Sequence, residues 1–140
     1  MFLTVLGRHG PYPRPGGACS WYFIEDAPTR VLSACGSGVL SRLMEHVHPV
    51  NLDAIVLSHL HFDHCSDLLV MRYALEQQDV RAGEEKRRVP LYTPNEPFET
   101  LKTITNGALF AQHTVKGGDE IQIGTLHFSF VPMAHPVPTN

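Results

Sequence analysis

The sequence has few cysteines, no long apolar run and no excess of positive charge. Its three cysteines, Cys19, Cys35 and Cys65, are too few and odd in number for a disulfide framework, which favours the reducing cytoplasm. No segment approaches the ~18 consecutive apolar residues of a transmembrane helix, and the first residues lack the basic region of a signal peptide. A net charge of −3 gives no general attraction to nucleic acid or to an anionic membrane. We therefore predict a cytoplasmic protein without membrane contact.

The chain has the composition of one globular domain, with 43% apolar and 18% charged residues. Apolar patterning predicts strands around residues 2–6, 19–25, 30–33, 54–57 and 89–93, and a hairpin over residues 117–130. Helical spacing predicts helices over 38–47 and 66–77, and a third beginning at Pro97. Strands with interspersed helices favour an α+β fold, with a mixed sheet and helices packed against one face.

Nine histidines are present, and three of them fall within residues 59–64 together with Asp63. His59 and His61 follow the buried run 54–57 in extended chain, where side chains two residues apart point the same way. Asp63 and His64 lie where the chain turns into a helix, so they diverge from the first pair and can serve a second ion. Imidazole and carboxylate are the ligands that hydrolytic metals prefer. An accidental cluster in a surface loop is disfavoured, because burying these polar groups would cost free energy without return.

The segment Ser58-His59-Leu60-His61-Phe62-Asp63-His64 matches the HxHxDH signature of the metallo-β-lactamase superfamily. The chain resembles the ribonuclease Z and cyclic-phosphodiesterase branch of that family from its first residue to its last. The other segments that carry the resemblance are Thr4-Val5-Leu6-Gly7, Gly10-Pro11-Tyr12-Pro13, Cys35-Gly36-Ser37-Gly38 and Ala134-His135-Pro136-Val137-Pro138.

The resemblance implies a metal-dependent hydrolase that uses a metal-activated water. His59, His61 and His135 would bind the first metal, and Asp63 and His64 the second. The ions would be one or two Zn²⁺, with Mn²⁺ or Fe as alternatives, and Asp63 would orient the attacking water or shuttle its proton. His9, in the Gly-Pro loop, would lie at the mouth of the active site as an exposed loop residue or a substrate contact.

Two departures from the family pattern stand out. Ala34 occupies a position where the family usually has an Asp that supports the ligands, and losing such support typically costs ~10–100-fold in metal affinity or activity. The family also continues through a second half, which supplies a metal-bridging Asp and a further His. Residues 1–140 would thus form the N-terminal half of an αββα sandwich, with one apolar sheet face uncovered. We expect a homodimer or a fragment of a longer chain.

The substrate class is less sharply predicted than the metal ligands. The resemblance favours a phosphodiester, and the acidic net charge ranks a small phosphodiester above RNA. Thioesters and lactones are alternatives, because other branches share the signature. A non-catalytic remnant or metal-binding module is the competing hypothesis, which Ala34 and the missing half both favour. Cys65 is predicted to be a packing residue, and the remaining histidines are predicted to lie at the surface or half-buried: His46, His48, His113 and His127.

Overall fold

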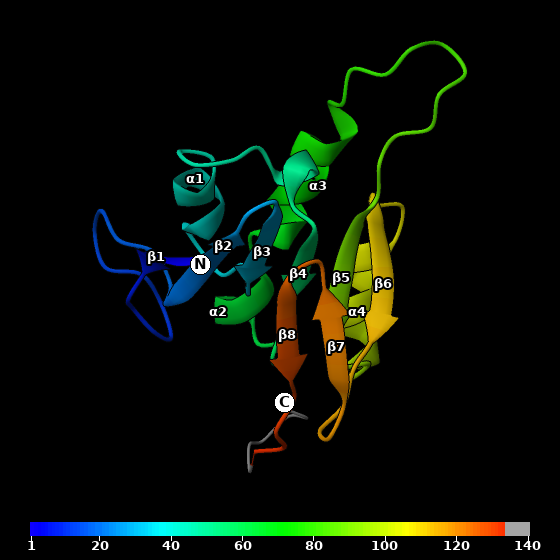
Figure 1. The fold of residues 1–140 in the computed structure, drawn as a ribbon. Coiled ribbons are helices and arrows are strands. Elements are labelled where there is room, and N and C mark those ends of the chain that lie inside the picture. The colour runs from blue at the N-terminus through cyan, green and yellow to red at the C-terminus, as the bar shows by residue number, and fades with distance from the viewer. Residues whose placement is uncertain (134–140) are drawn as a thin grey trace.

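The computed structural model describes residues 1–133, which build a six-stranded mixed sheet in the order β1-β2-β3-β4-β5-β6 (Figure 1). The first three strands are antiparallel, and β3 to β6 are parallel. The strands are β1 (Phe2–Gly7), β2 (Trp21–Asp26), β3 (Thr29–Ser33), β4 (Ala54–Val56), β5 (Val89–Thr93) and β6 (Phe110–Thr114). A separate antiparallel hairpin consists of β7 (Glu120–Ile123) and β8 (Leu126–Ser129).

The helices are short and lie in the connections between strands. They are α1 (Val39–Leu43), the 3₁₀ turn η1 (Pro49–Asn51), α2 (Phe62–Cys65), α3 (Leu68–Glu76) and α4 (Phe98–Thr105). Within residues 1–133, no helix has both the length and the apolar character needed to cross a membrane.

Strand β4 positions the histidine motif at the centre of the fold. It lies between β3 and β5, parallel to both, and all three of its residues are buried. A strand covered on both faces reads as a continuous apolar run, which is why residues 54–57 carry no polar alternation. The prediction of a buried strand directly before residue 59 is confirmed.

The two faces of the sheet are covered by different elements, helices on one face and the hairpin on the other. Phe23, Ile55 and Leu91 belong to the core shared with the helices. On the other face, the hairpin buries Val31 and Val56 in a second, smaller core. The prediction of an α+β fold with helices on one face is confirmed.

The hairpin covers only the middle of its face. Leu3 pairs with Ile24 and Val5 with Tyr22, so these side chains share the face of the second core. Leu3 and Val5 are each 59% exposed, and Tyr22 is 38% exposed. The predicted uncovered apolar face is therefore present at β1 and β2, and is absent where β7 and β8 lie.

Several predicted boundaries are wrong, for identifiable reasons. Strand β6 is not predicted, because only Phe110 of its five residues is buried and an edge strand needs no apolar alternation. Helix α1 ends at Leu43 instead of residue 47. After it, the chain forms hydrogen bonds between residues three apart, from Glu45 N–H to the Arg42 carbonyl and from His46 N–H to the Leu43 carbonyl. The helix predicted over 66–77 is present as α3, and the short helix α2 before it, which begins inside the histidine motif, is not predicted.

Asp67, between these two helices, links α3 to α1. Its Oδ2 accepts a hydrogen bond from the Leu40 backbone N–H at 2.9 Å. Burial raises the pKa of Asp67 above the ordinary value of 3.8, while hydrogen bonds from the backbone of Leu40, Gly38 and Val39 act in the opposite direction. The N-cap of α1, Gly38, has no side chain to bond these N–H groups, so Asp67 performs that function from the neighbouring helix.

Replacing Asp67 with alanine is expected to lower the free energy of unfolding by about 1–2 kcal/mol, because α1 loses its capping carboxylate. Asp67→Asn should retain part of that contribution through its amide oxygen. Since the folded-state pKa of Asp67 is raised, its protonated form favours folding below pH 3.8, and this contribution is lost as pH rises through the folded-state pKa.

Urea denaturation between pH 4 and 7 measures both effects. The advantage of wild type over Asp67→Asn should shrink as pH rises, and Asp79→Ala, at an exposed carboxylate, is the control. An Asp67→Ala protein as stable as wild type at pH 7 would contradict the capping role.

Candidate metal centre

The histidine motif lies at the carboxyl end of β4, where extended chain turns into α2. His61 is the N-cap of that helix, with extended backbone at φ −69° and ψ 149°. Asp63 and His64 are inside the helix, so their side chains leave the backbone in directions different from those of His59 and His61. The expected change from strand to helix is present, and it occurs at residue 62 instead of 66.

The His59 imidazole lies against two other imidazoles of the motif. The ring centroids of His59 and His61 are 4.8 Å apart, and those of His59 and His64 are 3.7 Å apart. The Ser58 hydroxyl lies 3.0 Å from Nδ1 of His59 and 3.5 Å from Nδ1 of His64. Asp63 Oδ2 lies 3.4 Å from His64 Nε2. The structure therefore brings together the four predicted site residues of the motif.

The chemistry of these side chains fits zinc, but their arrangement alone does not complete a ligand set. Within residues 1–133, no three His, Cys, Asp or Glu side chains converge as ligands for one ion. His135, the predicted third ligand of the first metal, lies outside the described residues. A metal site with three or four ligands thus stays a prediction.

Trp21, the first residue of β2, contacts the backbone and a side chain of the motif. Its indole N–H donates a hydrogen bond to the Asp63 backbone carbonyl at 3.1 Å. Its ring meets the His64 imidazole edge-on, with centroids 4.4 Å apart. Sequence reasoning placed Trp21 in a strand and assigned it no role, because nothing in the spacing from residue 21 to 63 indicates contact. The one feature of the sequence that indicates a role for Trp21 is that the single tryptophan of the chain follows a loop rich in glycine and proline.

The loop after β3 packs directly against the backbone of the motif. The Cys35 N–H donates to the His64 carbonyl at 2.7 Å. Gly36 approaches so closely that a Cβ on it would lie 1.7 Å from the carbonyl oxygen of Asp63. Only glycine fits there, so Gly36 sets the position of the helix turn that carries Asp63 and His64.

Ala34, which stands where the family usually has Asp, is fully buried at the end of β3. Its N–H donates to the Val56 carbonyl at 2.9 Å, beside the exit of β4. Its φ of +58° lies in the left-handed region, which costs an ordinary residue roughly 1–2 kcal/mol and which Asp and Asn tolerate better. A methyl group offers no hydrogen bond to the histidines, so this chain lacks the support that the resemblance implies.

The three cysteines are free thiols, as predicted, and all are buried. Burial, and to a lesser extent the charge of Asp63, raises the pKa of Cys65 to about 12. Its thiol donates to the His61 carbonyl at 3.2 Å. Burial also raises the pKa of Cys19 and, more strongly, of Cys35. Cys65 is fully buried in the main core, as expected of a packing residue.

A surface cavity of about 310 Å³ borders the motif. Asp63 and His64 line it on one side, with Trp21 and the His9 loop on the other. The predicted position of His9, at the mouth of the candidate site, is confirmed. Within residues 1–133, the other histidines outside the motif are exposed, also as predicted: His46, His48, His113 and His127.

Comparison with known proteins identifies the class. A family described as the beta-lactamase superfamily domain matches residues 29–140. The solved structure of the metallo-beta-lactamase fold protein YhfI from Bacillus subtilis superposes with a TM-score of 0.85 over 98% of this chain, at 27% identity. The chain belongs to the metallo-β-lactamase superfamily.

Curated relatives of the chain include a probable metallo-hydrolase and a ribonuclease. The chain is 32% identical to the probable metallo-hydrolase YhfI of Bacillus subtilis over 98% of its length, and 30% identical to ribonuclease Z of Methanopyrus kandleri over 99%. It covers 56% and 48% of those proteins, and so spans about half the length of the curated relatives it matches. A diphosphatase of the PhnP family shares the fold, with a TM-score of 0.72 at 22% identity over 98% of this chain and 59% of that one.

Proposed function

We propose that this protein is a metal-dependent hydrolase of phosphodiesters. The observation that carries the proposal is the cluster of His59, His61, His64 and Asp63 at the end of β4, beside a cavity of about 310 Å³. Imidazole and carboxylate donors at such a place suit a hydrolytic metal. The names of the relatives, a ribonuclease and a diphosphatase, favour phosphate esters over thioesters and lactones.

In this proposal His59, His61 and His135 hold the first ion, and Asp63 and His64 hold the second, with zinc as the expected metal. When bound by these residues, such an ion would supply Lewis-acid chemistry toward a phosphoryl oxygen and would favour deprotonation of water. A small phosphodiester fits the acidic net charge better than RNA.

The residues around the motif hold its donors in place. The Ser58 hydroxyl lies within reach of both His59 and His64, so it orients two imidazoles at once. Trp21 fixes the Asp63 backbone and covers the His64 ring. Asp63 borders the cavity, where its carboxylate is 22% exposed and within reach of a substrate or a water. We assign to it the transfer or orientation of a proton.

We also propose that residues 1–140 make one half of an αββα sandwich in the active protein. The exposed apolar strip of Leu3, Val5 and Tyr22 lies on the face that such a second layer would cover. A second copy of the chain, or further residues of the same protein, would supply that layer.

The proposal is tested with protein expressed from its complete reading frame and loaded with zinc. It is expected to hydrolyse bis(p-nitrophenyl) phosphate faster than a thioester or a lactone. Chelation followed by desalting should abolish the activity, and added zinc should restore it. Preference for the thioester or lactone would contradict the substrate class, while hydrolysis that survives chelation would contradict metal dependence.

A non-catalytic, metal-binding role is the second candidate, and Ala34 favours it because a buried methyl group replaces a supporting carboxylate. Such a protein would bind zinc, measured by metal analysis after desalting, and would turn over none of the three esters.

A further inference from the structure

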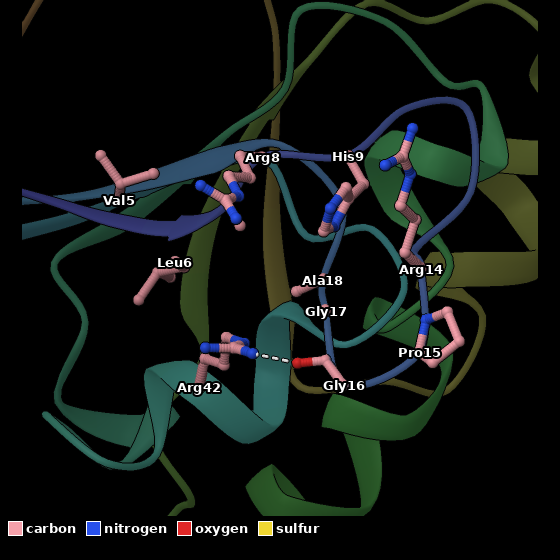
Figure 2. A pocket seen from close by; sticks show the side chains of 11 residues that line it. Val5, Leu6, Arg8, His9, Arg14, Pro15, Gly16, Gly17, Ala18 and Arg42 are labelled. Carbon is pink, nitrogen blue, oxygen red and sulfur yellow. Dashed lines mark hydrogen bonds between the residues drawn. The ribbon is translucent and has the colours of Figure 1, made fainter.

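The loop of residues 8–18 and helix α1 enclose a cavity of about 460 Å³ (Figure 2). It is distinct from the cavity at the histidine motif and contains none of the proposed metal ligands. Arg8 and Arg42 lie on opposite sides of the hollow in Figure 2, and His9 and Gly17 lie along a third side. Arg14, from the same loop, also lines it.

The lining of this cavity is cationic in a chain of net charge −3. It includes three arginines and a histidine, and no aspartate or glutamate. Across residues 1–133, the ion pairs do not involve Arg8, Arg14 or Arg42, so their charges are not neutralised by a carboxylate of the described chain. Three guanidinium groups around one hollow repel one another unless an anion lies between them.

Arg42 is anchored in place by the loop. Its Nη2 donates to the Gly16 carbonyl at 2.5 Å, which fixes the guanidinium at the end of α1 that faces the cavity. An arginine held by one N–H keeps its other donors available, so it is ordered before a ligand arrives. Arg8 is exposed and lines the cavity on the side opposite to Arg42.

His9 forms the wall between this cavity and the candidate metal centre, because it lines both. Gly17 lies directly beneath its ring, and a Cβ on Gly17 would stand 2.4 Å from His9 Nδ1. That nitrogen is buried and makes no hydrogen bond within residues 1–133. The arginine cavity and the histidine motif are thus neighbours, separated by one imidazole.

We propose that the cavity binds a phosphate group, through Arg8 and Arg42 with Arg14 assisting. Guanidinium groups bind phosphate oxygens by paired, charge-assisted hydrogen bonds, and a dianion satisfies several arginines at once. The phosphate is either a second phosphate on a substrate whose diester lies at the histidine motif, or free inorganic phosphate. Binding is independent of the hydrolase assignment, and only the substrate source rests on the proposed function.

Calorimetric titration of inorganic phosphate and pyrophosphate tests the binding. The protein, from its complete reading frame, is stripped of metal with EDTA and desalted, so that phosphate cannot bind to zinc. Arg8→Gln and the double variant Arg8→Gln/Arg42→Gln are expected to bind about tenfold more weakly or worse. Arg88→Gln, an exposed arginine outside the cavity, is the matched control.

Absence of phosphate binding to the metal-free wild type, or equal binding by wild type and Arg8→Gln, would overturn the proposal. Arg8 is exposed, so Arg8→Gln tests the cavity even if replacing Arg42 disturbs folding.

A second measurement identifies the source of the phosphate. A nucleoside 2′,3′-cyclic phosphate is compared with the same compound carrying a 5′-phosphate. If the substrate supplies the phosphate, Arg8→Gln raises KM about tenfold for the second compound only. If free phosphate is the ligand, both KM values stay unchanged while calorimetric binding is still lost. Phosphate binding without turnover of either compound would contradict the proposed hydrolase and leave the phosphate site supported.

Discussion

The variant His61→Ala is expected to lose hydrolysis of bis(p-nitrophenyl) phosphate by about a hundredfold or more. His61 lies at the N-cap of α2 with its ring 4.8 Å from that of His59, and it is a proposed ligand of the first metal. Loss of a residue that merely supports a ligand costs ~10–100-fold, so loss of a ligand itself should reach or exceed that range. Zinc content after desalting should fall together with the activity.

The control for His61→Ala is His113→Ala. His113 is an exposed imidazole that stacks on Tyr92 and lies on β6, two strands from β4 in the sheet. It should keep wild-type activity and zinc content. If His61→Ala retained both, the imidazole cluster would not be a metal centre.

The variant Gly36→Ala is expected to lower the free energy of unfolding by about 3 kcal/mol, the upper end of the usual cost of inserting an atom into a packed interior. A Cβ at this position would lie 1.7 Å from the Asp63 carbonyl oxygen, so one of two backbone segments must move. The displacement acts on the helix turn that carries Asp63 and His64, and metal affinity should fall as well.

Gly10→Ala is the matched control, since nothing lies within 4 Å of a Cβ at Gly10. Urea denaturation and zinc titration measure the two effects. If Gly36→Ala were as stable as Gly10→Ala, the loop after β3 would accommodate the added methyl group at little cost. That result would contradict the role of Gly36 in positioning the motif.

The sequence predicted the fold best where burial imposed a pattern. Strand β4 is buried on both faces and its apolar run predicted it. Strand β6 is an edge strand with only Phe110 buried, so its sequence carried no such pattern. The early start of α2 was missed because Phe62, Asp63 and His64 show no helical periodicity, and the helix there depends on the packing of the loop around Gly36.

The sequence predicts those contacts of the candidate site that join residues close together in the chain. Residues two positions apart in extended chain predicted the contact between His59 and His61, because that geometry is local. The contacts of Trp21 with Asp63, and of Asp67 with Leu40, join segments 42 and 27 residues apart. Such contacts depend on strand order and helix packing, which no local pattern encodes. The same holds for the cavity between Arg8 and Arg42.

The edge-on contact between Trp21 and His64 also allows the candidate metal centre to be followed by tryptophan fluorescence. The chain has one tryptophan, so its tryptophan fluorescence comes from a single indole. That indole is half-buried, hydrogen-bonded to the Asp63 carbonyl and in contact with the imidazole of His64. A cation bound at His64 would change the electric field at the indole, so zinc binding is expected to alter the emission without any added dye.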